Sequence, residues 1–178
     1  MPFDQAKADR ACAFFSMLKH TDGKFYGQPF KLLPWEEKIL RDVYGTIKED
    51  GTRQYRYIWV EVPKKNGKSE LGAGVALYHL FADGEINGEV YGCAADREQA
   101  SIIYDVASKM LELVPAMLKR SKILPSYKKI TDKVSGTRYK VMSSEAYTKH
   151  GYKPSAVLFD EIHAQPNREL WDVMTHGS

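Results

Sequence analysis

The chain has 178 residues, of which 43% are hydrophobic and 28% are charged, and its formal net charge at pH 7 is +3. These values are typical of one globular domain with a hydrophobic core, and the charge is too small to establish a polyanion as a partner. No run of about 18 apolar residues occurs, and the N-terminus has no apolar signal segment, so a membrane-spanning or secreted protein is not indicated. We therefore expect a cytoplasmic protein without a membrane partner.

The two cysteines, Cys12 and Cys93, lie among apolar or small residues and show no C-x-x-C spacing. The five histidines are scattered and form no zinc-binding pattern with them. Both cysteines are therefore predicted to be reduced residues of the core.

Two helices are predicted at the N-terminus. Residues 4–19 place apolar side chains on one helical face, and a second helix begins at Pro34, with Gly45 just beyond its end. Trp35, together with the apolar residues before it, could clamp an adenine ring, but such residues more often belong to a core. The segment 1–50 is thus expected to be a helical lead-in to the main domain, with an adenine-binding segment as one interpretation.

The stretch 57–71 reads Y-I-W-V-E-V-P-K-K-N-G-K-S-E-L. Alternating apolar residues over 57–62 predict a strand, and Gly67-Lys68-Ser69 then opens a helix, which is the pattern of a phosphate-binding loop. Backbone N–H groups of such a loop point at an anion, the lysine adds a mobile charge, and the serine hydroxyl binds magnesium. The match is incomplete, because the full motif has glycine where Val62 stands.

Further elements follow in order. The loop helix should run to about residue 82, and its Gly72 and Gly74 suggest close packing on a sheet. A strand is predicted over 89–95 and a helix from the N-cap Asp96 to about residue 114, with these residues facing inward: Ile102, Ile103, Val106, Met110 and Leu111. Segments 129–134 and 137–142 predict a hairpin.

One region is locally basic, and its simplest interpretation is a solvated face. Its residues are Lys119, Arg120, Lys122, Lys128, Lys129 and Lys133.

A second chemical signal stands at residues 156–161, A-V-L-F-D-E. Four apolar residues predict a buried parallel strand that delivers two carboxylates at its C-terminal edge, where open α/β sheets bind ligands. Asp160 would hold magnesium through its water shell, and Glu161 would polarise the attacking water. Together with the loop, this predicts nucleotide hydrolysis.

The predicted fold is α/β, a phosphate-loop NTPase with a mainly parallel sheet flanked by helices. At least one strand lies between the two nucleotide motifs, as in the class where a catalytic glutamate directly follows the magnesium aspartate. Segments 89–95 and 137–143 both qualify for that inserted position. The phosphate-loop core would span residues 51–178.

The sequence resembles the N-terminal ATPase domain of tailed-phage large terminases, the motors that package DNA into procapsids. The motifs that carry the resemblance are G-Q-P-F-K-L-L-P-W-E-E-K-I-L-R-D-V-Y-G, W-V-E-V-P-K-K-N-G-K-S-E-L, V-Y-G-C-A-A-D-R-E-Q-A and L-F-D-E-I-H-A. The resemblance implies that Lys68 and Ser69 bind phosphates and magnesium, that Asp160 binds magnesium, and that Glu161 is the catalytic carboxylate. The remaining loop residues implied in nucleotide binding are Lys64, Lys65, Asn66 and Gly67.

The sequence departs from this family at three points. Glu36 stands where the family usually has a glutamine that reads adenine, and a glutamate cannot donate a hydrogen bond. Lys149 stands in the neighbourhood where some terminases carry an arginine finger that acts on a neighbouring subunit. It is a candidate for that role, although a lysine lacks the planar, bidentate geometry of arginine. The chain also ends at Ser178 without a second carboxylate cluster, so no nuclease activity is expected from it.

The leading interpretation is an ATPase motor domain that uses ATP and Mg²⁺. Its implied partners are double-stranded DNA, a portal and a small terminase subunit, in a ring of like subunits, although the free domain is expected to be a slow monomer. A nucleotide- or DNA-binding fragment with little turnover is one alternative. A helicase-like translocase domain is another.

Overall fold

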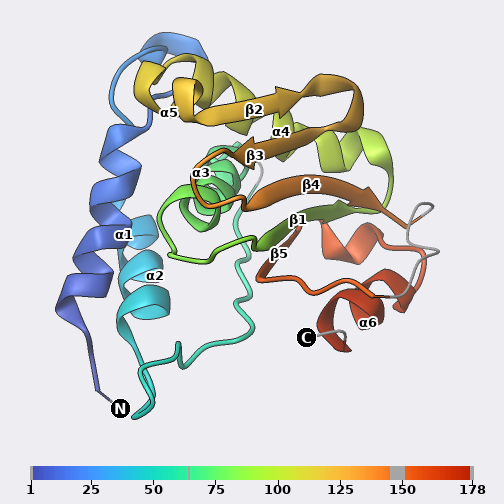
Figure 1. Cartoon of the computed structure of the whole chain (residues 1–178), viewed down its shortest axis with the longest axis horizontal. Helices are drawn as coiled ribbons and strands as arrows, with labels where there is room; N and C mark the ends of the chain where they lie inside the picture. Colours follow the sequence, from blue (N-terminus) through green and yellow to red (C-terminus); the bar gives the residue numbers. More distant parts are fainter. Residues whose placement is uncertain (1, 64, 145–150, 177–178) are drawn as a thin grey trace.

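The computed structural model describes residues 2–63, 65–144 and 151–176. A central sheet is covered by helices, and the N-terminal helices lie at one side (Figure 1). The helices are α1 (Gln5–Met17), α2 (Pro34–Gly45), α3 (Lys68–Phe81), α4 (Arg97–Glu112), α5 (Pro115–Arg120) and α6 (Glu169–His176). The strands are β1 (Glu89–Ala94), β2 (Ser121–Leu124), β3 (Lys129–Asp132), β4 (Arg138–Ser143) and β5 (Ala156–Phe159). Short 3-10 turns occur at η1 (Gly23–Phe25), η2 (Pro125–Tyr127) and η3 (Ile162–Ala164).

The five strands form one sheet in the order β2-β3-β4-β1-β5. Strands β4, β1 and β5 are parallel, and β2 and β3 continue the sheet as an antiparallel extension. The predicted α/β fold and the hairpin of β3 and β4 are confirmed, whereas β2 had no prediction. Because parallel strands end on the same edge, the C-terminal ends of β1, β4 and β5 lie together.

The main core lies between the sheet and the helices α3 and α4, with α1 and α2 packed beyond α3. Val90, Ile130 and Tyr139 occupy one cross-strand row on this side and are fully buried. The ring of Tyr139 stacks on Tyr104 of α4, which identifies the face that α4 covers. The register of the sheet therefore assigns every other residue of β3 and β4 to the opposite face.

A smaller core lies on that opposite face, under α6. Leu170 and Met174 of α6 pack with Tyr91, Cys93 and Met142 of the sheet. This contact covers the strand ends near β5. No helix of the described residues covers the other end of the same face, over β2 and β3 (Figure 1).

The helix predictions are confirmed where local signals are strong. Asp96 caps α4 by accepting a hydrogen bond from the Gln99 N–H at 2.8 Å, and Pro34 opens α2. Within α4, Ile103, Met110 and Leu111 are buried as predicted. Ile102, however, is exposed, while Tyr104 and Ala107 are buried. The inward face of α4 is therefore rotated from the predicted one, because Tyr104 meets Tyr139 on the sheet.

Gly72 and Gly74 of α3 are needed for contacts with helices and not with the sheet, which corrects the prediction. A Cβ atom at Gly74 would lie 2.2 Å from the Phe15 ring of α1, and one at Gly72 would lie 3.1 Å from Ile103 of α4. The two glycines thus let α1 and α4 approach α3 closely. Helix stability lost through glycine is offset by this packing.

The strand predicted over residues 57–62 is not part of the sheet. The segment has no regular secondary structure, and its large apolar side chains are exposed, with Trp59 at 71%. An alternating pattern favours extended backbone, but a strand also needs a neighbour for its N–H and C=O groups. Among the described residues none pairs with this segment, and β5, predicted to be buried, is a half-buried edge strand.

Both cysteines have the predicted reduced state, Cys93 being buried and Cys12 half-buried against the main core. Burial raises the pKa of both thiols, which keeps them protonated. Across the described part of the chain, no helix has the length and apolar character needed to cross a bilayer.

Candidate active site

The phosphate loop meets α3 at Gly67. This residue is the N-cap of α3 with φ +75°, a left-handed conformation that suits glycine, and Lys68 and Ser69 are the first two helical residues. Asn66 closes the loop by donating from Nδ2 to the Pro63 carbonyl oxygen at 3.1 Å. The Gly67 N-cap makes no side-chain hydrogen bond to the first turn of α3. Because the first N–H groups of a helix have no partner within the helix, this helix end suits an anion.

Glu70 in the first turn of α3 joins the loop to the N-terminal segment. His20 Nδ1 lies 3.0 Å from Glu70 Oε2, and the Thr21 N–H donates to Glu70 Oε1 at 3.2 Å. The His20 ring in turn stacks on Phe30 at 4.7 Å. Sequence reasoning missed Glu70, although its position as the third helical residue is a signal for a capping carboxylate.

The carboxylate pair lies at the end of β5, as predicted. The Asp160 N–H donates to the Cys93 carbonyl oxygen at 2.9 Å, which extends the pairing of β5 with β1 by one residue. Glu161 then adopts φ +47° and turns the chain into η3. A left-handed non-glycine residue is uncommon, and such residues often occur at functional sites.

These two elements bring Lys68 and both carboxylates together. Lys68 Nζ lies 2.7 Å from Asp160 Oδ1 and 3.7 Å from Glu161 Oε1. The side chain of Asp160 is 7% exposed, whereas that of Lys68 is 42% exposed. Partial burial acts to lower the pKa of Lys68, but the hydrogen bond to Asp160 and the two negative charges outweigh it and raise that pKa, so the ammonium stays charged.

Glu36 also reaches this site. Its side chain is buried, Oε2 accepts from the Leu33 N–H at 2.8 Å, and Oε1 lies 3.7 Å from the position that a Cβ atom on Gly67 would take. Burial raises the pKa of Glu36. Trp35 is half-buried and packs against the main core, so its contacts are those of a core residue.

Of the other predicted site residues, two lie in the described part of the chain and two do not. Lys65 and Asn66 are exposed in the loop, and Lys65 is left-handed with φ +67°. Lys64 and Lys149 lie outside the described residues.

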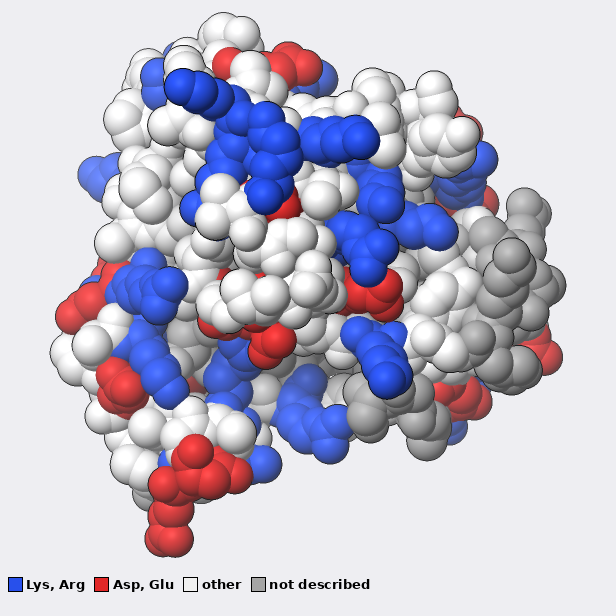
Figure 2. Space-filling view, viewed as in Figure 1, with Lys and Arg blue, Asp and Glu red and all other residues white. Residues whose placement is uncertain are grey.

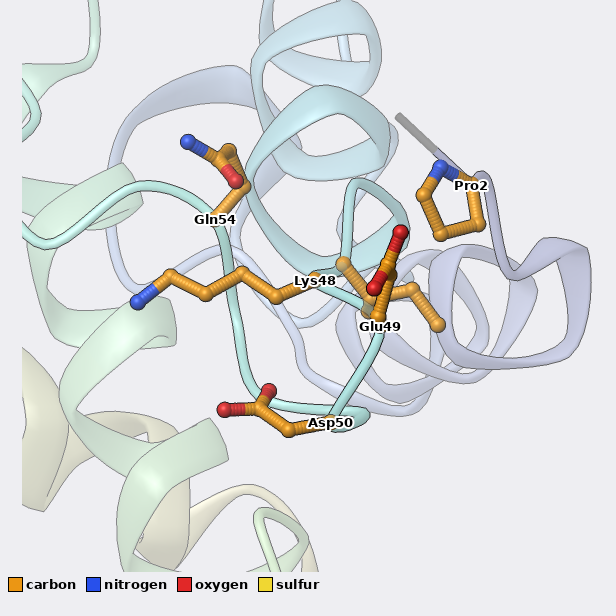
Figure 3. Close-up of a pocket in the computed structure, with 6 residues that line it drawn as sticks. Pro2, Lys48, Glu49, Asp50 and Gln54 are labelled. Atoms are coloured by element: carbon orange, nitrogen blue, oxygen red, sulfur yellow. The ribbon is translucent and has the colours of Figure 1, made fainter.

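A surface hollow near the start of the chain does not coincide with this site. It has a volume of about 580 Å³ and lies between the start of the chain and the loop after α2, lined by Pro2, Ile47, Lys48, Glu49, Asp50 and Gln54. The side chains of Lys48 and Asp50 extend away from Pro2 and Glu49, so the polar groups do not converge (Figure 3). A ligand site requires polar groups that converge, so this hollow is not a candidate.

The donors at the site suit a magnesium ion that is shared with phosphates. Asp160 and Ser69 offer oxygen ligands, which Mg²⁺ prefers, and Mg²⁺ is typically held by one or two carboxylates plus phosphate oxygens and water. No group of three or more His, Cys, Asp and Glu side chains that could hold a metal by itself occurs in the described ranges. The residues thus fit a metal that arrives with a nucleotide.

The chain is similar to known proteins in sequence and in fold. Residues 34–177 match the family model for the terminase large subunit, ATPase domain. The terminase large subunit of Enterobacteria phage HK97 is 33% identical over 141 residues, which cover 79% of this chain and 27% of that protein. The crystal structure of the HK97 bacteriophage large terminase superposes with a TM-score of 0.82 at 29% identity, covering 97% of this chain and 35% of that one.

The chain thus spans about a third or less of the length of the relatives that it matches. The match includes the loop, β5 and the carboxylate pair, because all lie within residues 34–177. This chain belongs to the family of terminase large subunit ATPase domains.

Proposed function

We propose that this chain binds ATP with Mg²⁺ between the N-terminus of α3 and the end of β5, and hydrolyses it to drive DNA packaging. The observation that carries the proposal is the convergence of Lys68, Asp160 and Glu161, with Lys68 Nζ 2.7 Å from Asp160 Oδ1. A helix N-terminus, a cation and two carboxylates that can hold a metal lie at one sheet edge. This combination suits a nucleoside triphosphate better than it suits any neutral ligand.

Lys68 would exchange partners when ATP binds. Its ammonium now pairs with Asp160, and its 42% exposure leaves it free to turn toward phosphate oxygens. Ser69 and Asp160 would then hold the metal, directly or through water. Bound Mg²⁺ would neutralise charge on the phosphates.

Glu161 would orient and polarise the water that attacks the γ-phosphate. Its side chain is 34% exposed, so water reaches it, and its left-handed backbone turns it away from the strand direction. In-line attack needs a positioned water more than a strong base, because phosphoryl transfer passes through a loose transition state.

A cation from a neighbouring subunit would complete the site. Such groups increase phosphoryl-transfer rates by about 10³-fold or more. Lys149 is the candidate within this sequence, and Lys64 and Lys65 are the alternatives within the loop. We expect the free chain to be a slow monomer whose specific activity rises with protein concentration, and activity that is high and independent of dilution would point to a loop lysine instead.

The proposal also covers the domain organisation, the partners and the location of the protein. Residues 1–50 would form the helical lead-in and residues 51–178 the phosphate-loop core of one ATPase domain, without nuclease activity of its own. Its partners would be double-stranded DNA, a portal and a small terminase subunit, and the motor would work as a ring in the cytoplasm of the host cell.

Nucleotide titration by calorimetry tests the proposal. The wild-type chain should bind ATP more tightly with Mg²⁺ than without it, and Lys68→Ala should weaken binding by about 10-fold to 100-fold, because one charged hydrogen-bond donor is worth about 1.5–3 kcal/mol. Lys109→Ala, an exposed lysine of α4, is the matched control and should leave affinity unchanged. Equal affinity of Lys68→Ala and wild type would mean that the loop is not a phosphate site.

A further inference from the structure

Four basic side chains share the sheet face that α4 does not cover. In the register of the sheet, one cross-strand row reads Lys122, Thr131, Arg138 and Glu89, and another reads Leu124, Lys129, Lys140 and Tyr91. These rows alternate with the buried row of Ile130 and Tyr139, which faces α4, so they project to the other side. We call Lys122, Lys129, Arg138 and Lys140 the cation face.

The cation face differs from the basic region predicted from sequence. Two members of that region are neutralised on the α4 side of the sheet: Arg120 by Asp132 at 2.6 Å and Lys128 by Asp105 at 2.7 Å. Arg138 and Lys140, which lie further along the chain, join the face only because β4 pairs with β3.

Acidic side chains neutralise only a small part of the positive charge on the cation face. Glu89 Oε1 lies 3.5 Å from Arg138 Nη2, and Glu89 also accepts the Tyr91 hydroxyl at 2.9 Å. Within the described ranges, no carboxylate forms an ion pair with Lys122, Lys129 or Lys140. Among the described residues, four positive charges thus share this face with one paired negative charge.

The pairing of β3 with β4 places like charges side by side. Lys129 is the direct cross-strand partner of Lys140. Like charges in this position destabilise a sheet, because their Cβ atoms are about 5 Å apart. Binding an anion between them would remove that repulsion.

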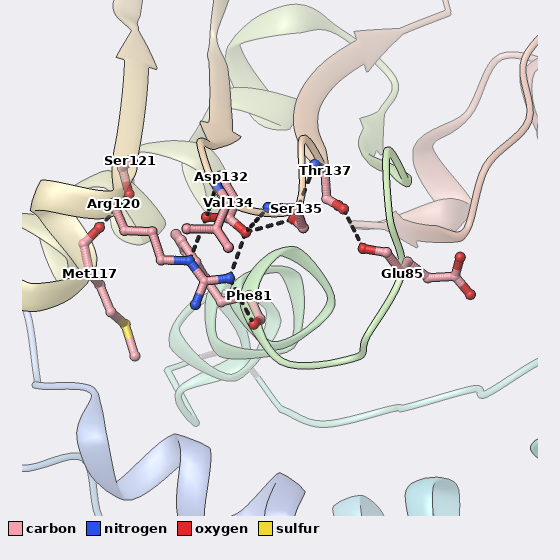
Figure 4. A network of polar contacts seen from close by, with 9 residues as sticks. All are labelled: Phe81, Glu85, Met117, Arg120, Ser121, Asp132, Val134, Ser135 and Thr137. Atoms are coloured by element: carbon pink, nitrogen blue, oxygen red, sulfur yellow. Dashed lines mark hydrogen bonds and ion pairs between the residues drawn. The ribbon is translucent and has the colours of Figure 1, made fainter.

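Lys122, Arg138 and Lys140 of the cation face are exposed, and Lys129 is half-buried. Lys and Arg side chains gather over α5 and strands β2 to β4 (Figure 2), and a hollow of about 300 Å³ lies beside them, lined by Glu89, Tyr91, Lys129, Arg138, Lys140, Gly151 and Tyr152. On the opposite side, Arg120 and Asp132 fix the ends of β2 and β3 (Figure 4). These contacts fix the positions of the strands that carry the four cations.

We propose that the cation face is a docking surface for the phosphate backbone of duplex DNA. Neighbouring strands are about 4.8 Å apart and alternate residues of one strand about 6.7 Å apart, so the ammonium groups form a flat lattice. Duplex DNA carries one charge per about 1.7 Å of axis, so a cluster of cations can contact several phosphates without reading bases.

An acidic protein surface suits the face less well. Protein interfaces depend on buried aromatic and aliphatic anchors, and Lys is depleted from them. In these two rows the apolar members are Leu124, which is half-buried, and Tyr91, which is buried. Three of the four cations are lysines, which bind phosphates as mobile point charges.

The inference deepens the proposed function, since a DNA motor domain needs a surface that grips the duplex without sequence preference. The two can fail separately. A variant of the cation face that loses DNA binding but binds ATP normally would support the cation face alone. A variant of Lys68 that loses ATP binding but binds DNA normally would support the phosphate loop alone.

The test measures binding of the 178-residue chain to a short fluorescent DNA duplex by anisotropy over a series of salt concentrations. Four phosphate contacts predict that log K falls with log salt at a slope of about −3.6. The double variant Lys129→Ala/Lys140→Ala should reduce that slope by about 1.8 and weaken binding at 0.1 M salt by about tenfold or more. Its affinity for ATP should match that of the wild type.

Two controls separate position from total charge. Lys48→Ala/Lys109→Ala removes the same charge from exposed sites elsewhere, on the loop after α2 and on α4, and should leave the slope unchanged. Lys129→Arg/Lys140→Arg keeps the charge and should bind DNA as wild type does. Equal loss in the Lys48/Lys109 variant would overturn the proposal, because net charge would then explain binding.

Polyglutamate serves as the competing ligand. If Lys129→Ala/Lys140→Ala binds the duplex as wild type does but loses affinity for polyglutamate, the face belongs to an acidic protein and the proposal is wrong. If the variant loses duplex binding while its unfolding transition by circular dichroism lies at or above that of wild type, the proposal stands.

Discussion

Two buried aspartates of this domain pair with a cation, and they differ in how completely they are bonded. Asp132 accepts from Arg120 through both oxygens at 2.6 Å, and from the Ser135 hydroxyl and two backbone N–H groups (Figure 4). Asp160 has a single close contact among the described residues, with Lys68 Nζ at 2.7 Å. The bidentate pair holds a turn in place, whereas the single contact can be exchanged for another ligand.

The two cations, Arg120 and Lys68, also differ in how firmly they are held. Arg120 is fixed by its planar contact and by the Phe81 carbonyl oxygen of α3, while Lys68 is a flexible side chain shared between Asp160 and Glu161. A carboxylate whose bonds are all made stabilises a fold. One with bonding capacity left over is suited to a ligand or a metal.

The largest effect is expected for Glu161→Gln. The amide keeps the size of the side chain but cannot polarise water, so ATP turnover should fall by about 10²-fold to 10⁴-fold while ATP binding persists. Phosphate release and nucleotide titration measure the two quantities. Turnover within a few-fold of wild type would remove Glu161 from the reaction.

Asp132→Ala should be strongly destabilising. It leaves Arg120 without its partner and removes the acceptor of the Val134 and Ser135 N–H groups, so the free energy of unfolding should fall by about 3 kcal/mol. Urea denaturation provides the measurement. Asp105→Ala, which removes an exposed ion pair with Lys128, is the control and should change stability by less than about 1 kcal/mol.

Asp160→Asn should affect ligand binding more than stability, which is the opposite of what is expected for Asp132→Ala. Stability should change little, because the carboxylate has one close partner, but the dependence of ATP affinity on Mg²⁺ should weaken by about tenfold since a metal ligand loses its charge. Calorimetry with and without Mg²⁺ measures this. A phenotype identical to that of Glu161→Gln would contradict the separate roles of the two carboxylates.

The smallest effect concerns pH. Burial acts to raise the pKa of Asp132, but the hydrogen bonds from Arg120 and Ser135 outweigh it and lower that pKa from 3.8 to about 2. A lowered folded-state pKa contributes stability that is complete above 3.8 and is lost as the pH falls toward about 2. Wild type should therefore lose more stability over this window than Asp132→Asn, and parallel pH profiles of their unfolding midpoints would refute the assignment.

Much of the site could be predicted from local sequence. Gly67-Lys68-Ser69 at a helix start and two carboxylates after four apolar residues are short-range signals, because a helix cap or a strand end depends on neighbours in the chain. The structure adds that Lys68 lies between Asp160 and Glu161, and that Glu70 ties the loop to His20. Those contacts join segments far apart in sequence.

What the sequence by itself determined is the set of chemical groups and the helices that carry them, since caps and 3.6-residue periodicity act over a few residues. Only the tertiary structure decided which extended segments pair. The segment 57–62 has a strand pattern but pairs with no strand among the described residues, whereas β2 has a weak pattern and pairs with β3. Strand pairing depends on distant residues, so the register that sets Lys129 opposite Lys140 could not be read from either segment alone.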